Sequence, residues 1–100
     1  MPRLFKALGW VVFFWSNEGS PTECVHVHIG KRISPNATKI WVLSDCSTKI
    51  ANNNSRIPEK ELNRLISIIE DNYEEIVELW RKMFGPVIRF YDKGGGGENV

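Results

Sequence analysis

The sequence predicts a small α+β domain in which an antiparallel sheet of three to four strands packs against a C-terminal helical unit. Two observations support this fold class. Short runs of aromatic and β-branched residues fill the N-terminal half, which is typical of strands. Apolar residues at helical spacing fill the stretch 62–83. With 100 residues, 42% hydrophobic and 25% charged, the chain has the size and composition of one globular domain.

The strands follow from the apolar runs and the turn residues between them. The run Trp10–Trp15 lies between Gly9 and the turn-forming segment 16–21, so it is expected to be a strand covered on both faces. Residues 39–43 are expected to form another strand, and residues 47–50 a short fourth one. The short links favour an antiparallel meander.

Residues 23–29 alternate, so their side chains are expected to form two sets on opposite faces of a strand. The set that faces the core is Val25, Val27 and Ile29. The set on the other face is Cys24, His26 and His28.

The helical unit is predicted from apolar residues spaced four and three apart. These residues are Leu62, Ile66, Ile69, Tyr73, Ile76, Trp80 and Met83. Pro58 suits the first turn of a helix, and Gly85-Pro86 ends the pattern. One helix of this length would span about 39 Å, longer than a domain of this size is wide. We therefore expect one kinked helix or two helices, with Asp71 or Asn72 capping the second.

Two alternatives stay open at the C-terminal end. The same spacing could form the seam of a coiled-coil homodimer through the C-terminal helix. Residues 87–91 could add an edge strand or pack along the helix. Residues 1–93 are expected to form the single domain, and the Gly-rich residues 94–100 a flexible tail.

The composition indicates where the protein is located and which classes of protein it does not resemble. No apolar run reaches the ~18 residues of a membrane span, and no small-residue cleavage site follows the N-terminal apolar run. Two cysteines are too few for a secreted disulfide scaffold. We therefore expect a cytoplasmic protein with no membrane association.

Charge is distributed unevenly along the chain. Residues 1–56 hold seven Lys and Arg against three acids, a net +4, whereas residues 57–100 hold six against nine, a net −3. The basic half could contact phosphates of nucleic acid, but four charges over 56 residues is a weak pattern. An ordinary mixed surface explains it equally simply.

The spacing Cys24-x-His26-x-His28 is the one constellation that suggests chemistry. Two histidines two residues apart on a strand share a face, so their rings can converge on one divalent metal such as zinc, with Cys24 as a third ligand. Glu18, Asp45 or Cys46 could replace Cys24. No other cofactor is predicted, and the competing interpretation is a structural pair bonded to neighbouring groups.

Without a metal, His26 and His28 could act as catalytic acid and base near neutral pH. The candidate binding residues beside them are Glu18, Lys31, Arg32 and Trp41. Lys31, Arg32 or Lys39 could supply positive charge for a phosphate, and Trp41 is an aromatic residue of the kind favoured at interfaces. This arrangement would suit RNA cleavage.

Several of these motifs together resemble a bacterial family known as domain of unknown function 4160. The resemblance rests on an aromatic strand ending in Ser16-Asn17-Glu18, on His26-Val27-His28, and on a helical unit ending near Trp80. Val25 stands where family members usually have proline. The resemblance implies no established activity. It implies a neighbouring gene for a small partner protein, as in a toxin–antitoxin pair.

Three functions follow as hypotheses. The first is a protein-interaction module, one component of a toxin–antitoxin-like pair, that binds its partner through the sheet edge or the helix face. The second is a ribonuclease or metal-dependent hydrolase that uses His26 and His28. The third is a nucleic-acid-binding regulator that uses the basic half of the chain.

Overall fold

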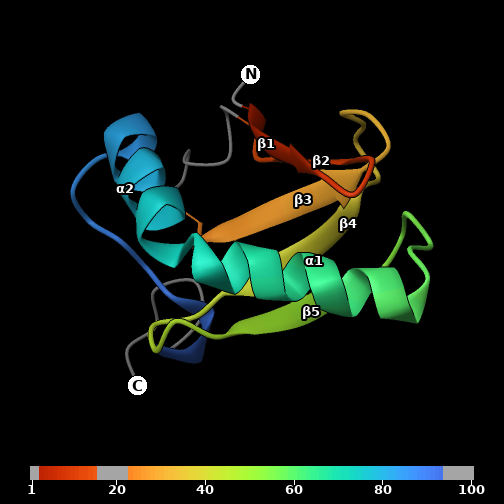
Figure 1. Cartoon of the computed structure of the whole chain (residues 1–100). Coiled ribbons are helices and arrows are strands. Elements are labelled where there is room, and N and C mark those ends of the chain that lie inside the picture. The colour runs from red at the N-terminus through yellow and green to blue at the C-terminus, as the bar shows by residue number, and fades with distance from the viewer. Residues whose placement is uncertain (1–2, 16–22, 94–100) are drawn as a thin grey trace.

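The computed structural model describes residues 3–15 and 23–93. Five strands form one antiparallel sheet in the order β1-β2-β3-β4-β5, and two helices follow (Figure 1). The elements are β1 (Arg3–Ala7), β2 (Trp10–Phe13), β3 (His26–Gly30), β4 (Thr38–Val42), β5 (Thr48–Asn52), α1 (Glu59–Asp71), α2 (Tyr73–Phe84) and a short 3-10 helix, η1 (Tyr91–Lys93). The predicted α+β class and meander are confirmed, with five strands instead of three or four.

The additional strand is β1, which pairs with β2 through a two-residue turn. Leu8 and Gly9 form this turn with positive φ angles of 53° and 83°. A positive φ is uncommon for leucine, so the residue type gives no warning of a tight hairpin here. For this reason the sequence pattern did not predict the turn, and β1 was missed with it.

The main core lies between one face of the sheet and the helices. Val12, Val27 and Ile40 of the three central strands pack against Leu65 of α1 and Trp80 of α2. Figure 1 shows α1 along the sheet and α2 across one end of it. The predicted core set of β3 and its approach is confirmed, because Val25, Val27 and Ile29 are all fully buried in this cluster.

The helical unit breaks at Asn72, so it consists of two helices as one of the alternatives predicted. The Asn72 backbone N–H donates to the carbonyls of Ile68 and Ile69, and its side-chain Nδ2 donates to Ile68 as well. The Asn72 carbonyl accepts from Ile76 N–H, which starts the next helix. The break fits the longest dimension of the molecule, 34 Å, which is shorter than a single helix of this length. Neither helix in the described part of the chain has the length and apolar character of a membrane span.

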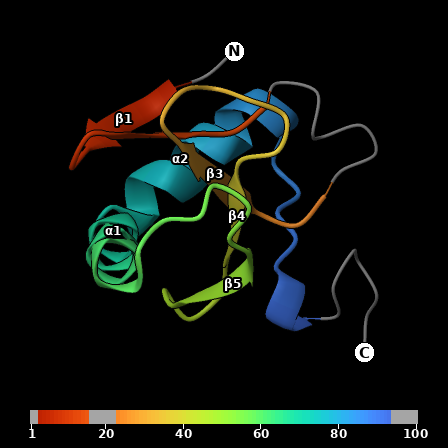
Figure 2. The ribbon, with the colours of Figure 1, turned by 90° about the vertical axis from the view of Figure 1, so that its right-hand side faces the viewer.

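After α2 the chain crosses to the second face of the sheet. Residues 85–93, which we call the C-terminal segment, descend on the side opposite α1 (Figure 2). Arg89 C=O accepts from Val25 N–H at 3.0 Å, and Asp92 accepts from the backbone and hydroxyl of Ser44. The edge strand considered for residues 87–91 does not form. The tail predicted for residues 94–100 lies outside the described residues.

Candidate functional site

A continuous row of ring contacts runs across the second face of the sheet. We call it the aromatic row, and its members are Phe13, His28, His26, Trp41 and Tyr91. Successive ring centroids lie 5.4, 5.0, 5.7 and 4.6 Å apart. The strand register explains the order, since Phe13 pairs with His28, and His26 pairs with Trp41. Cross-strand partners share a face, so these rings are brought together by the sheet itself.

His26 is the central member and has no exposed surface. Its Nδ1 lies 2.8 Å from the backbone carbonyl of Cys24. A carbonyl can only accept, so Nδ1 carries the hydrogen and donates. The ring also meets Trp41 and Trp80 edge-on, with centroids 5.7 and 5.3 Å away. The sheet and α2 therefore both contact this histidine.

His28 is 7% exposed and stacks on Phe13 at an interplanar angle of 29°. The two histidine rings meet edge-on at 87°. Phe13 belongs to a second, smaller cluster on this face, together with Val11 and Ala37. The polar set predicted from alternation therefore does lie opposite the core set, but it is buried as well.

A metal at the histidine pair would need ligands from elsewhere. In the ranges 3–15 and 23–93 no three His, Cys, Asp or Glu side chains are grouped to hold an ion. Cys24 meets His26 through its carbonyl, and burial raises the pKa of its thiol, an effect that Arg89 opposes. A protonated thiol is a poor metal ligand. Asp45 is hydrogen-bonded to Ser47 instead.

Catalysis by this pair stays a prediction. A ring with no exposed surface reaches a substrate only if the residues packed around it move away. Exposed Cys46 lies apart from the row, in a hollow beside Tyr73 at the junction of the helices. Glu18, a predicted binding residue and alternative ligand, lies outside the described residues.

The other predicted binding residues separate into two places. Lys31 and Arg32 follow β3 and line a hollow of ≈250 Å³ together with Trp10. Trp41 pairs with His26 at the opposite end of β3, stacks on Tyr91 and lies under the ammonium of Lys39. Lys31 and Arg32 therefore lie apart from the histidines, whereas Trp41 contacts His26 within the aromatic row.

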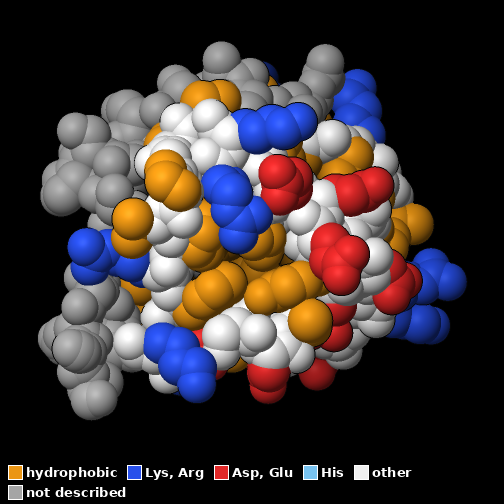
Figure 3. All heavy atoms as spheres, turned by 90° about the vertical axis from the view of Figure 1, so that its left-hand side faces the viewer, with side chains coloured by type: hydrophobic (Ala, Val, Ile, Leu, Met, Phe, Trp, Pro, Cys, Tyr) orange, Lys and Arg blue, Asp and Glu red, His pale blue; other side chains and the backbone are white. Residues whose placement is uncertain are grey.

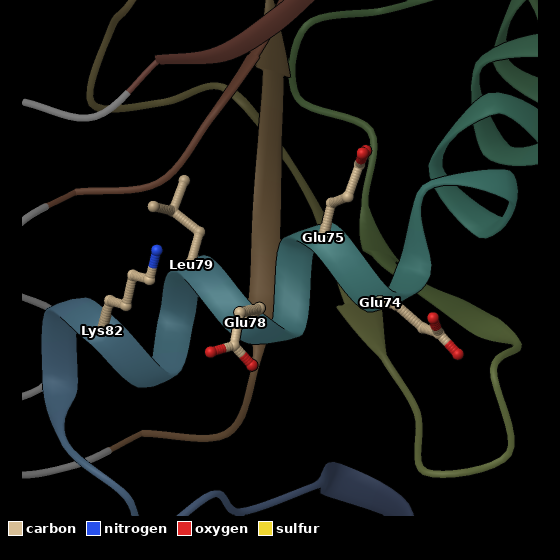
Figure 4. A pocket seen from close by; sticks show the side chains of 5 residues that line it. All are labelled: Glu74, Glu75, Glu78, Leu79 and Lys82. Carbon is tan, nitrogen blue, oxygen red and sulfur yellow. The ribbon is translucent and has the colours of Figure 1, made fainter.

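The outward face of α2 carries a feature that the sequence patterns did not single out. A hollow of ≈530 Å³ is lined by Glu74, Glu75, Glu78, Leu79 and Lys82. Figure 4 shows Glu75, Leu79 and Lys82 on one side of the helix and Glu74 and Glu78 on the other. On this face, hydrophobic side chains gather in the middle and acidic ones along one side (Figure 3).

A smaller depression of ≈100 Å³ adjoins this hollow, where α2 meets β1. Leu4 and Phe5 of β1 line it with Ile76 and Leu79 of α2. Glu75 and Leu79 line both spaces, so they are continuous. We call the two together the acidic groove. The sequence feature that could have indicated this groove is Leu79, an apolar residue outside the series of apolar residues that predicted the helical unit.

Comparison with models of known protein families shows which family this chain belongs to. The family model described as "Domain of unknown function (DUF4160)" matches residues 9–81. The chain belongs to the DUF4160 family. The comparisons with curated proteins and with solved structures give no match.

The DUF4160 match spans β2 through most of α2. It includes four members of the aromatic row, and it leaves out Tyr91 and strand β1. The histidine pair is thus part of the DUF4160 region, whereas β1 and the C-terminal segment lie beyond it. Trp80, which contacts His26, and Tyr91, the last member of the row, could not be assigned to it from sequence, because they lie far along the chain from β3.

Proposed function

We propose that this chain is a protein-interaction module, one component of a toxin–antitoxin-like pair, and that it binds its partner protein in the acidic groove. One observation carries the proposal. Leu79 lies among three glutamates in a hollow of ≈530 Å³ that continues into an apolar depression. An apolar floor with a charged rim is the usual composition of a protein interface.

The charge of the rim favours a basic partner segment. Three glutamates, Glu74, Glu75 and Glu78, line the hollow against the single Lys82, so its lining is net negative. Arg81 neutralises part of this charge through an exposed ion pair with Glu78 at 2.9 Å. Acidic side chains repel nucleic-acid phosphates and attract lysine and arginine, which argues for a protein partner at this face.

The depression between α2 and β1 supports an apolar anchor. Its volume of ≈100 Å³ suits a single side chain, and Leu4, Phe5 and Leu79 supply apolar walls. A basic amphipathic segment would place one apolar residue there and its cations along the rim. The partner of this chemistry is the small protein encoded beside this chain, which the family resemblance implies.

The test is a binding measurement between this chain and the product of the adjacent gene. Glu75→Lys and Leu79→Ala should each weaken the complex about tenfold in titration calorimetry, because they reverse a rim charge or remove the apolar floor. The matched controls are Glu59→Lys and Ile50→Ala, exposed residues of the same kinds on α1 and β5. Both controls should bind as the native chain does.

Other outcomes identify other occupants. Equal affinity of all four variants would overturn the groove as the binding site. Light scattering of the isolated chain tests for a homodimer. A dimer that Glu75→Lys dissociates would assign the groove to a second copy instead of a partner protein.

A further inference from the structure

We infer that the hollow lined by Lys31 and Arg32 binds a phosphate group. It lies at the end of the sheet away from α2, where β3 turns into the loop before β4. Its volume is ≈250 Å³, and its lining is completed by Trp10, Gly30, Ser34 and Ser55. This site is separate from the acidic groove, so it does not depend on the proposed partner.

The walls of the hollow are fixed by close packing and hydrogen bonds. A Cβ on Gly30 would lie 2.7 Å from the carbonyl oxygen of Arg32, so only glycine allows the loop to fold back here. The Ser55 hydroxyl donates to the Ile29 carbonyl at 2.7 Å and accepts from Thr38 N–H at 3.0 Å. A prebuilt site of this kind loses little conformational entropy on binding.

Lys31 is held in position, and neither Lys31 nor Arg32 has an acidic partner among the described residues. Lys31 Nζ lies 4.1 Å from the centre of the Trp10 ring, and Trp10 is held in turn by its Nε1 hydrogen bond to Glu61. The ion pairs of the described residues do not include Lys31 or Arg32. Their charge is therefore available to a ligand.

A phosphate group matches this set of donors. An ammonium, a guanidinium and the hydroxyl of Ser34 surround one hollow, and the Ser34 side chain makes no hydrogen bond to the described residues. Phosphate offers three or more acceptor oxygens and at least one negative charge, so it can accept from all three at once. A carboxylate carries one negative charge, whereas a phosphate monoester carries up to two and so balances both cations more fully.

The phosphate could come from a free phosphate compound or from an RNA backbone, and the experiment separates these sources. The labelled full-length chain is titrated with sodium phosphate and with adenosine monophosphate at constant ionic strength, and amide shifts of Gly30 and Lys31 are followed by NMR. A fluorescent single-stranded RNA is titrated in parallel by anisotropy. Saturable shifts at these amides are expected.

The decisive variant is Lys31→Gln/Arg32→Gln, compared with Lys49→Gln/Arg64→Gln. The control pair removes the same charge from exposed positions outside the hollow. The first pair should weaken binding about tenfold and the second should not. RNA binding with the same variant dependence would assign a phosphodiester, and saturation by the small phosphates alone a free phosphate. Equal losses in both pairs, or no saturation by any of the three ligands, would overturn the site.

Discussion

At the scale of single residues, the histidine pair shows how a fold decides what a motif can do. His26 donates from Nδ1 to the Cys24 carbonyl and is enclosed by Trp41 and Trp80. His28 stacks on Phe13 and keeps a small exposed fraction. The two residues are equivalent in the sequence pattern, but only the first is completely removed from solvent. Its main expected contribution is therefore to stability.

Replacing His26 by alanine should lower the free energy of unfolding by about 2–4 kcal/mol, because it leaves a cavity among aromatic rings and removes the hydrogen bond to Cys24. His26→Phe keeps the ring volume and should cost about 1–2 kcal/mol. Urea unfolding of each variant measures these values. A His26→Ala chain with native stability would contradict the structural role and return the residue to the catalytic hypothesis.

Sequence reasoning could place these side chains but not their surroundings. Alternation along residues 23–29 put His26 and His28 on the face opposite Val27 and Ile29, as found, whereas Cys24 precedes β3, which begins at His26. Whether that face is exposed or covered depends on residues far along the chain, such as Trp80, which contacts His26, and Tyr91, which stacks on Trp41. No local pattern carries that information, because it is a long-range contact.

At the scale of elements, the C-terminal segment covers the Trp41 end of the aromatic row. Tyr91 stacks on Trp41 with rings nearly parallel at 9° and centroids 4.6 Å apart. Asp92 fixes η1 to the β4–β5 turn through Ser44, and Arg89 accepts from Val25. A ring stack, hydrogen bonds to a carboxylate and a backbone hydrogen bond therefore hold the C-terminal segment, although it does not form a strand.

Tyr91→Ala should loosen this cover without unfolding the sheet. The cost should be about 1 kcal/mol, the usual value of a stacked aromatic pair, since Tyr91 itself is 40% exposed. Exchange of the Val25 amide hydrogen should become faster, because its acceptor is Arg89 of the same segment. Hydrogen exchange followed by NMR measures this. Lys93→Ala, in the same turn, is the control, and unchanged Val25 exchange in Tyr91→Ala would refute the cover.

The helices and strands differ in how far sequence could predict them. The spacing of apolar residues continues unchanged from Leu62 to Met83, so it predicted the helical face but could not distinguish one kinked helix from two. Asn72 breaks the helical unit through its own hydrogen bonds, and the spacing of the apolar residues is the same on both sides of the break. Strand β1 was missed because its turn places Leu8 at positive φ. The acidic groove was missed because it needs β1 and α2 together.

At the scale of the whole molecule, titrating groups should limit stability at both ends of the pH range. On the acid side, hydrogen bonds from Ser47 and Ser44 lower the pKa values of Asp45 and Asp92 below 3.8. The unfolded chain then binds these protons more tightly than the folded one. Their contribution is present above pH 3.8 and is lost as the pH falls through the folded pKa values.

On the alkaline side the sign is reversed. Burial raises the pKa of the Cys24 thiol above 9.0 and that of the Tyr73 hydroxyl above 10.0. The folded state keeps these protons when the unfolded chain has released them. Stability is therefore unaffected by them below pH 9.0 and declines above it, as ionisation increasingly favours the unfolded chain.

The free energy of unfolding should accordingly be highest on a plateau between the two limits, and two variants identify the groups responsible. Asp92→Asn should be less stable than the native chain at pH 7. The difference should shrink as the pH falls below 3.8 and through the lowered folded pKa of Asp92, where the aspartate becomes uncharged like the asparagine. Cys24→Val should show a shallower decline above pH 9.0, since one ionising group is gone. Urea titrations at a series of pH values measure both slopes. A constant Asp92→Asn difference across the acid range, or an unchanged alkaline slope in Cys24→Val, would show that other groups set these limits.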